Sequence, residues 1–349
     1  MIGYIARAVG APTPTLVLDQ RQLPKDHGEL RPVLTRVREW LEEHGREDIL
    51  KFALVEPSEH PLYDLDYRFV QGLPTGVDRF DFNGNCGHSI LASVVAADGQ
   101  AWLPRLAPGG RVRVRVLNNG DQVVVEVDEA RRRSGSFTVH FLQDAGARLD
   151  DLLLTGNPVD QLLTPSGVQA ASLVSMGNPY VFVDATELGL DTEEKLFGAG
   201  DETFAQMLEI RVAAAELLQW PTDGVFPKIA AVGGYTPGRL AVRAISVPKW
   251  HPSIALTGTT CLAGAASIPG TVPERLAREA GLQRGVIEID TPGGSTAAAA
   301  SVAGRGDGAD TLHWVSVSRK LAQLDEPHCI GSLKNYDYKE ETAWQPLTV

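Results

Sequence analysis

Hydrophobic residues recur along the chain with two different periods. Between residues 30 and 44 they stand three or four positions apart, which predicts a helix with one buried face. Alternating valine and arginine at 111–117, the turn signal Asn118-Asn119-Gly120 and a second apolar segment at 123–128 predict a β-hairpin with one solvent-exposed face. Another helix is expected over 193–218, with a break near 198–200. Further strand-like segments lie at 4–7, 16–18, 50–56, 65–71, 137–141, 168–174, 179–183, 229–232, 240–247, 285–289 and 314–318.

One stretch combines the end of a strand, glycines and a cysteine. Asn83-Gly84-Asn85-Cys86-Gly87-His88-Ser89 precedes a run of small apolar residues at 90–97, so the pattern places a thiol at the start of a helix. The unsatisfied N–H groups and the positive end of the helix dipole favour an anion there, either a thiolate or a substrate carboxylate. Such a position lowers the pKa of a thiol and suits proton exchange near neutral pH.

A similar stretch recurs in the second half of the chain. Aligning Cys86-Gly87 on Thr257-Gly258 matches a short residue, a glycine, two polar residues and an apolar run of small residues. The offset, 257 − 86 = 171, is close to half of the 349 residues. It predicts two similar lobes that each present a helix N-terminus to a shared cleft. We expect an N-terminal lobe at 1–150, completed by 312–330, a C-terminal lobe at 151–311, and an extension at 331–349.

Length and charge limit the functions that the chain can have. Its 349 residues suffice for two domains, and a formal net charge of −12 argues against a general binder of nucleic acid or of membrane surfaces. Three cysteines are too few and too scattered for a disulfide framework or a zinc site, which favours a reducing compartment. We recognise neither a signal peptide nor a membrane-length apolar run. A cytoplasmic protein without nucleic-acid or membrane partners is therefore expected, and a homodimer is left open.

Several polar residues allow both a structural and a functional interpretation. Lys51 is the only basic residue of a mostly apolar strand, and the strand alone favours an edge-strand lysine whose ammonium reaches solvent. The arginines of the 111–117 strand are expected on a solvated face and not in a substrate clamp. His88 either contacts a ligand or faces solvent from the first helical turn. Cys261, one turn into its helix, is expected to pack in the core.

Several segments, taken in their order along the chain, resemble the PrpF family, the methylaconitate isomerase and oxalomesaconate tautomerase group of the diaminopimelate epimerase-like fold. The resemblance extends over about residues 4–330. The segments that carry it are Asp64-Leu65-Asp66-Tyr67-Arg68-Phe69-Val70-Gln71, Gly84-Asn85-Cys86-Gly87, Thr155-Gly156-Asn157-Pro158-Val159-Asp160, Ala171-Ser172-Leu173-Val174, Gly177-Asn178-Pro179-Tyr180-Val181-Phe182-Val183, Thr257-Gly258, Ile268-Pro269-Gly270-Thr271-Val272 and Val317-Ser318-Arg319-Lys320-Leu321.

The resemblance implies an α+β fold of two pseudo-symmetric lobes, each a sheet-rich half-barrel around a central helix, with the active site between them. It also implies proton removal and return at allylic carbons of di- or tricarboxylates, without metal or organic cofactor. The family's lysine–cysteine pair corresponds to Lys51 and Cys86. Thr257 stands where the related epimerases have a second cysteine. The family's glycine-rich loop should fall near 7–15, where this chain lacks the paired glycines and the lysine and offers only threonine hydroxyls.

We therefore predict an isomerase for a small anionic carboxylate, which moves a double bond or changes its cis–trans geometry. Lys51 and Cys86 would transfer the proton, and which of them is base and which is acid stays open. The predicted substrate-binding residues are Asn85, Gly87, His88, Ser89, Asn157, Asn178, His251, Thr257, Gly258 and Thr259.

Two other functions stay open at this point. An amino-acid racemase or epimerase would need a second thiol facing Cys86, and Cys261 is the only nearby choice. A binding or accessory protein of the same fold would result if the altered loop at 7–15 had ended catalysis, with the extension at 331–349 recruiting a partner.

Overall fold

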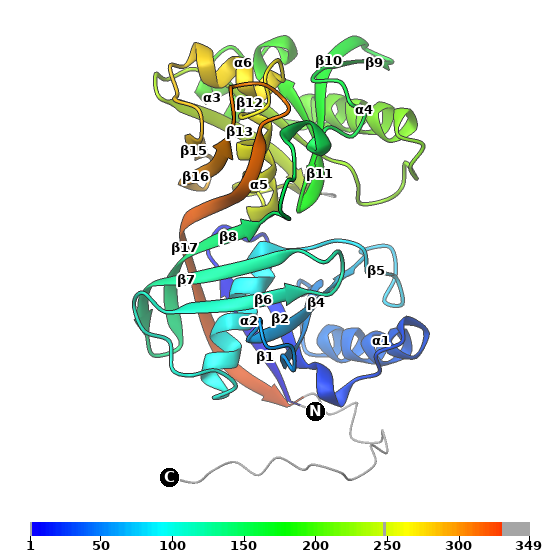
Figure 1. The fold of residues 1–349 in the computed structure, drawn as a ribbon. Coiled ribbons are helices and arrows are strands. Elements are labelled where there is room, and N and C mark those ends of the chain that lie inside the picture. Colours follow the sequence, from blue (N-terminus) through cyan, green and yellow to red (C-terminus); the bar gives the residue numbers. More distant parts are fainter. Residues whose placement is uncertain (1, 247–248, 330–349) are drawn as a thin grey trace.

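The computed structural model describes residues 2–246 and 249–329. Figure 1 shows two lobes, one above the other. We call the part formed by β1 to β8 with α1 and α2 the first lobe, and the part formed by β9 to β16 with α3 to α6 the second lobe. Strand β17 (Thr311–Cys329) runs from the second lobe into the first (Figure 1). The predicted extension at 331–349 lies outside the described residues.

The first lobe is a closed ring of eight strands around helix α2 (Gly87–Gly99). Strand pairing runs from β17 through β1, β2, β3, β4, β6, β7 and β8 back to β17. Helix α1 (His27–Glu43) packs on the outside of the ring. The strands are β1 (Ile2–Ala8), β2 (Thr15–Asp19), β3 (Lys51–Pro57), β4 (Leu65–Gly72), β6 (Arg111–Val116), β7 (Gln122–Arg131) and β8 (Ser134–Leu142), with the short β5 (Phe80–Asp81) beside β4.

The second lobe repeats this plan around helix α5 (Leu256–Ala265). Its sheet runs from β9 through β10, β11, β12, β13, β15 and β16 to β17. Residues 148–153 span the gap between the two ends of the sheet, with bridges from Arg148 to Thr311 and from Leu153 to Val174. The strands are β9 (Asp160–Thr164), β10 (Gly167–Met176), β11 (Asn178–Asp184), β12 (Lys228–Gly233), β13 (Arg239–Ser246), β14 (Lys249–Trp250), β15 (Val286–Thr291) and β16 (Gly294–Ala303).

Strand β17 takes part in the sheets of both lobes. Residues 311–318 pair with β16, whereas residues 320–323 pair with β8 and residues 322–329 with β1. Arg319 lies at the change of partners with φ of 59°, a conformation that interrupts regular strand geometry. The first lobe is thus closed by residues from the far end of the chain. The lobe boundaries near 150 and 311 stay a prediction.

The two central helices are held by apolar contacts on all sides. The described side chains of α2 include Ile90, Leu91 and Val94, each with no exposed surface. Burial of one such side chain contributes about 1.5–3 kcal/mol relative to an exposed position. Strands β1 to β4 are largely apolar on both faces, because one face covers α2 and the other covers α1. This packing fixes the place of the first turn of α2, where the thiol stands.

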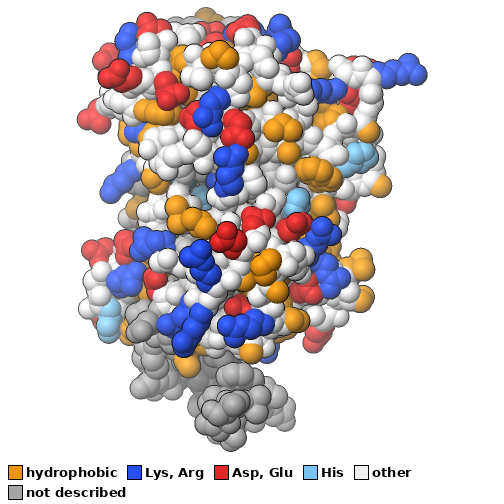
Figure 2. Space-filling model, turned by 90° about the vertical axis from the view of Figure 1, so that its left-hand side faces the viewer, with side chains coloured by type: hydrophobic (Ala, Val, Ile, Leu, Met, Phe, Trp, Pro, Cys, Tyr) orange, Lys and Arg blue, Asp and Glu red, His pale blue; other side chains and the backbone are white. Residues whose placement is uncertain are grey.

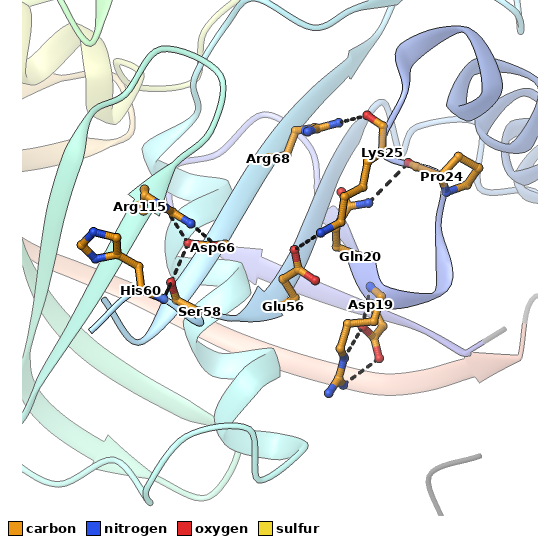
Figure 3. Close-up of polar contacts among 11 residues, drawn as sticks. Asp19, Gln20, Pro24, Lys25, Glu56, Ser58, His60, Asp66, Arg68 and Arg115 are labelled. Atoms are coloured by element: carbon orange, nitrogen blue, oxygen red, sulfur yellow. Dashed lines mark hydrogen bonds and ion pairs between the residues drawn. The ribbon is translucent and has the colours of Figure 1, made fainter. Parts of the chain in front are cut away.

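The arginines of β6 lie on the solvent-exposed face of the sheet, as predicted. Arg115 approaches Asp66 of β4 at 2.6 Å, and Ser58 donates a hydrogen bond to the same carboxylate at 2.8 Å (Figure 3). Arg113 and Arg111 form ion pairs with Asp64 and Glu126. These partially exposed pairs leave the arginines of β6 engaged with carboxylates of the protein itself.

The predicted elements agree with the structure at most places. The expected helix at 193–218 is indeed broken, into α3 (Glu193–Phe197) and α4 (Asp201–Leu217). Helix α6 (Val272–Glu279), which begins after the capping Thr271, was not predicted. Acidic and basic side chains are interspersed over the face drawn in Figure 2. Within the described residues, each helix is too short or too polar to cross a membrane.

Candidate active site

The N-termini of the two central helices meet at the junction of the lobes. A Cβ atom on Gly87, the first residue of α2, would lie 2.5 Å from Cδ2 and 2.9 Å from Cβ of Leu256, the first residue of α5. A Cβ atom on Gly258 would lie 2.5 Å from the hydroxyl of Tyr180. A side chain at Gly87 would therefore push the two helix starts apart, whereas one at Gly258 would collide with Tyr180 of the second lobe, so each copy of the repeat needs a glycine for a close contact of its own. The two helix starts therefore form one site.

Cys86 is the N-cap residue of α2 and makes no side-chain capping hydrogen bond. Its carbonyl oxygen accepts a hydrogen bond from the hydroxyl of the buried Tyr67 at 3.2 Å. Burial by itself raises the pKa of the thiol, but the ammonium of Lys51, the polar groups of the nearby Ser89 and the ammonium of Lys228 outweigh it, so that the pKa is lowered. The pKa of the thiol is thus shifted in the direction that the position at a helix start predicted.

Lys51 is the first residue of β3 and only 8% exposed. The interpretation as an edge-strand lysine is wrong, because β3 lies inside the sheet and Lys51 pairs with Thr15 of β2 on one side and Gln71 of β4 on the other. Its ammonium forms neither an ion pair nor a hydrogen bond with the described residues. A nearly buried, unpaired cation next to a thiol is costly unless an anion occupies the site.

Asn178, the first residue of β11, joins the two helix starts. Its side-chain oxygen accepts a hydrogen bond from the backbone N–H of Asn85 at 3.1 Å, and its amide nitrogen donates to the carbonyl oxygen of Asn85 at 2.8 Å. The same amide nitrogen donates to Oγ1 of Thr257 at 2.9 Å. Three predicted site residues from distant parts of the chain are therefore connected directly. The side-chain oxygen of Asn85 is buried and has no partner in the protein.

Two histidines are buried beside these residues. The rings of His88 and His251 are stacked with centroids 6.2 Å apart, and they are 1% and 2% exposed. The alternative of a solvent-facing His88 is wrong. Burial and the nearby lysines lower the pKa of both imidazoles well below the usual value, so both are neutral at pH 7. Neither ring nitrogen of His88 has a partner in the protein, whereas Nδ1 of His251 accepts from the N–H of Ser253.

The loop that departs from the family pattern reaches the same place. The carbonyl oxygen of Gly10 accepts a hydrogen bond from the hydroxyl of Ser253 at 3.0 Å. The hydroxyl of Thr15 lies 2.9 Å from that of Ser89 in the first turn of α2. The hydroxyl oxygen of Thr13 is buried without a partner. The loop thus brings one hydroxyl group, that of Thr15, to the first turn of α2.

The remaining predicted residues divide into two groups. Thr259 is buried in the first turn of α5, and its hydroxyl donates back to the carbonyl oxygen of Ala255 at 3.2 Å. Asn157 is not brought to the helix starts. It is exposed and donates a hydrogen bond to Asp160 at 3.0 Å. The adjoining Pro158 accepts a hydrogen bond from the hydroxyl of Ser172. The same hydroxyl oxygen accepts one from the N–H of Val272, near the C-terminal end of α5.

Two lysines of the site were missed by the sequence analysis. Lys228 begins β12 and Lys320 lies on β17, and burial lowers the pKa of each to about 8. The positive charge of Lys228 lowers the pKa of Cys86, and the charges of both lysines lower the pKa of His88. The available signal was a lysine at the start of an apolar strand, as at Lys51, in the second copy of the repeat.

The other thiol among the described side chains, that of Cys261, does not face Cys86. Cys261 is fully buried in α5, its Sγ donates to the carbonyl oxygen of Val174 at 3.2 Å, and burial raises its pKa. The expectation that Cys261 packs in the core is therefore confirmed. The side chain of Cys329 lies outside the described part. Among the described residues, no three or more His, Cys, Asp and Glu side chains gather in a group that could hold a metal ion.

Comparison with curated proteins finds relatives that are named for isomerisation of unsaturated acids. The chain is 30% identical over 284 residues to 3-methylitaconate isomerase from Eubacterium barkeri, with 70% of this chain and 74% of the relative covered. It is 27% identical over 270 residues to 4-oxalomesaconate tautomerase from Pseudomonas putida (70% and 72% covered). It is 25% identical over 292 residues to 2-methyl-aconitate isomerase from Cupriavidus necator (70% and 72% covered).

Comparison with solved structures agrees on the fold. A methylitaconate-delta-isomerase matches with a TM-score of 0.65 at 24% identity, over 94% of both chains. A hydroxyproline epimerase from Agrobacterium vitis matches with a TM-score of 0.63 at 13% identity, over 94% of this chain and 91% of that chain. The expected diaminopimelate epimerase-like fold is confirmed.

The names of the curated relatives also confirm the expected class of enzyme, an isomerase. The family model described as PrpF protein matches residues 45–326. Because this match spans most of the chain, the protein belongs to the PrpF family.

Proposed function

We propose that the protein shifts a proton between allylic carbons of a small di- or tricarboxylic acid, and so moves its double bond or changes its cis–trans geometry. Lys51 and Cys86 transfer the proton. The observation that carries this proposal is the thiol of Cys86 at the start of α2, whose pKa is lowered by a nearly buried lysine. One group removes the proton and the other returns it, without metal or organic cofactor.

A carbon acid beside a carboxylate is only weakly acidic, so the site must stabilise the enolate that forms when the proton leaves. The first turns of α2 and α5 offer backbone N–H groups and the positive ends of two helices. The ammonium groups of Lys51 and Lys228 add positive charge at the same place. Neutral His88 has two unpartnered ring nitrogens and offers one donor and one acceptor for a polar group of the substrate.

The substrate class follows from the relatives and from the charge of the site. The relatives are named for 3-methylitaconate, 4-oxalomesaconate and 2-methyl-aconitate. Lys51, Lys228 and Lys320 form no ion pair with the described residues. An acid with at least two carboxylates would neutralise this excess of positive charge. We therefore propose an unsaturated di- or tricarboxylate of the aconitate or itaconate type.

The proposal is tested by incubating the protein with such acids in heavy water and following deuterium incorporation by NMR. We expect incorporation at the allylic position and a new set of signals from the isomerised acid. The matched variants Cys86→Ser and Lys51→Met should lose both, whereas Cys261→Ser should keep them, since Cys261 is remote in the core. Absence of exchange with every acid of this class would contradict the proposal.

The two alternatives have less support. An amino-acid racemase needs a second thiol opposite Cys86. Thr257 occupies that place, and the thiol of Cys261 donates a hydrogen bond to the carbonyl oxygen of Val174 in the core. A non-catalytic binding protein would have no use for a poised thiolate. Alkylation of Cys86 at the rate of a free cysteine would favour that alternative, whereas faster alkylation near neutral pH supports the isomerase.

A further inference from the structure

A second amine stands at the site in addition to the one that the mechanism uses. Lys228, the first residue of β12, is partly buried. Its ammonium forms neither an ion pair nor a hydrogen bond with the described residues, and its closest aromatic contact is the ring of Phe226 at 5.8 Å. No carboxylate among the described residues forms an ion pair with it that would explain a lysine in an apolar strand.

Lys228 holds the position in the second lobe that Lys51 holds in the first. β3 runs parallel to β2 and antiparallel to β4, and β12 runs parallel to β11 and antiparallel to β13. Each lysine begins its strand. Lys51 stands opposite Thr15, whose hydroxyl meets Ser89 in the first turn of α2. Lys228 stands opposite Tyr180, whose hydroxyl lies against Gly258 in the first turn of α5.

The alternation of side chains along these strands shows where both lysines point. On β3, Ala53 and Val55 belong to the core cluster around α2, so the side chain of Lys51 lies on the same face. On β12, Ala230 and Val232 belong to the core cluster around α5, which puts Lys228 on the face of α5. The intervening residues Phe52, Leu54, Ile229 and Ala231 pack instead toward the outer helices α1 and α4.

The segment that leads into β12 also touches the first lobe at the thiol. The ring of Phe226 lies 3.1 Å from the position of a Cβ atom on Gly84, two residues before Cys86. Cys86 and Asp81 both attract the ammonium of Lys228, and Lys51 repels it. The lysine of the second lobe therefore stands across the junction from the thiol of the first lobe.

We propose that Lys228 is an anion-binding residue of the active site, which stabilises the Cys86 thiolate in the free enzyme and binds a substrate carboxylate during the reaction. The second part rests on the proposed function, and the first part does not. Burial lowers the pKa of Lys228 to about 8, so the side chain is still mostly protonated at pH 7. An ammonium that is already desolvated and unpaired binds a carboxylate strongly, because its own interactions with water have been given up.

The first test measures the thiol without any substrate. Alkylation of Cys86 by iodoacetamide is followed between about pH 6 and pH 10, with peptide mass spectrometry to separate Cys86 from the other thiols. In Lys228→Met, we expect about tenfold less reactive thiolate at neutral pH. The preference for negatively charged iodoacetate over neutral iodoacetamide should fall several-fold as well. Lys228→Arg keeps the charge and should stay near the wild type in both measurements.

Two controls separate this effect from the loss of any lysine. Lys195→Met removes an exposed lysine that pairs with Asp191 and should change nothing. Lys25→Met likewise removes an exposed lysine, which pairs with Glu56, and should leave the thiol profile unchanged. If Lys228→Met does not fold, Lys228→Gln repeats the comparison. Unchanged thiol reactivity and unchanged iodoacetate preference on removal of the charge would overturn the proposal.

The second test uses turnover of an acid that the wild type isomerises. Lys228→Met should raise KM for the dicarboxylate about tenfold or more, and Lys228→Arg should recover a substantial part of it. An unchanged KM in a folded Lys228→Met variant would refute the carboxylate contact. If the wild type turns over no acid at all, the proposed function fails. The alkylation experiment then still decides whether Lys228 holds the thiolate.

Discussion

The starts of α2 and α5 are two versions of one structural solution, and they differ in the functional group that stands before the glycine. In the first lobe the position before the glycine carries a thiol without a capping hydrogen bond and with a lowered pKa. In the second lobe it carries Thr257, whose hydroxyl oxygen is occupied by the amide of Asn178. The first helix start is thus equipped for proton transfer, and the second for holding the junction and for binding.

Unlike the thiol, which occurs in the first lobe alone, a lysine stands at the equivalent position of both lobes. Lys51 and Lys228 begin equivalent strands and face the two central helices. Because both lobes carry the lysine, both halves of the site attract anions. Because only the first lobe carries a thiol, the site has no second thiol as an acid–base group. This fits a reaction in which one acid skeleton gives up and regains a proton, and it does not fit inversion of an amino acid by two thiols.

The largest difference between the lobes is expected from removing the thiol. Cys86→Ala should lower kcat/KM by a factor on the order of 10²–10⁴, since that is the usual contribution of a positioned acid or base. The measurement is steady-state turnover of an acid that the wild type isomerises, with Cys261→Ala as the control in the core. Retention of activity within tenfold of the wild type would remove Cys86 from the proposed mechanism.

The close contact of the helix starts is broken by Gly87→Ala. The new methyl group would overlap Leu256, and the overlap should lower the free energy of unfolding by about 1–3 kcal/mol and separate the two helices. Urea unfolding checks the stability, and kcat/KM should fall along with it. Gly200→Ala adds a methyl group in open space and serves as the control. Equal effects of the two substitutions would argue against the contact.

The threonine of the second lobe is tested by Thr257→Val, which keeps the shape and removes the hydroxyl. The amide of Asn178 then loses one of its two acceptors in a buried place, which should cost about 1 kcal/mol. We expect up to a tenfold fall in kcat/KM with a small fall in stability. A fall as large as that of Cys86→Ala would mean that the second helix start also performs chemistry.

The smallest and most gradual effect is the dependence of stability on pH. His88 and His251 have pKa values lowered well below 6.5 in the folded protein. Below about pH 6.5 these two histidines become protonated in the unfolded chain but stay neutral in the folded chain. The free energy of unfolding therefore falls as the pH falls toward the folded pKa values. Above this range both states are neutral and the contribution is constant. His88→Gln should weaken the dependence, and the exposed His313→Gln should not, as measured by urea unfolding at about pH 7 and pH 5.5.

Local patterns were sufficient for most of the elements and for one half of the site. Leu30, Val33 and Leu34 follow the period of a helix, and the alternating valines of 111–117 follow that of a strand, because burial of one face imposes these spacings. The glycines around Cys86 indicated a helix start. Asn157 was predicted for the site from a motif, yet it lies near the opposite end of α5, because a motif carries no information on where its loop is packed.

By itself, the sequence determined the order of the elements, the place of a thiol at a helix start and the internal repeat. Only the tertiary structure decided that Asn178 bridges Asn85 and Thr257, that His88 is buried and neutral, and that the charge of Lys228 acts on the thiol of Cys86. The physical reason is distance along the chain. Periodicity and capping act over a few residues, whereas these contacts join residues about 80 to 140 positions apart through strand register and the approach of two glycine-bearing helices.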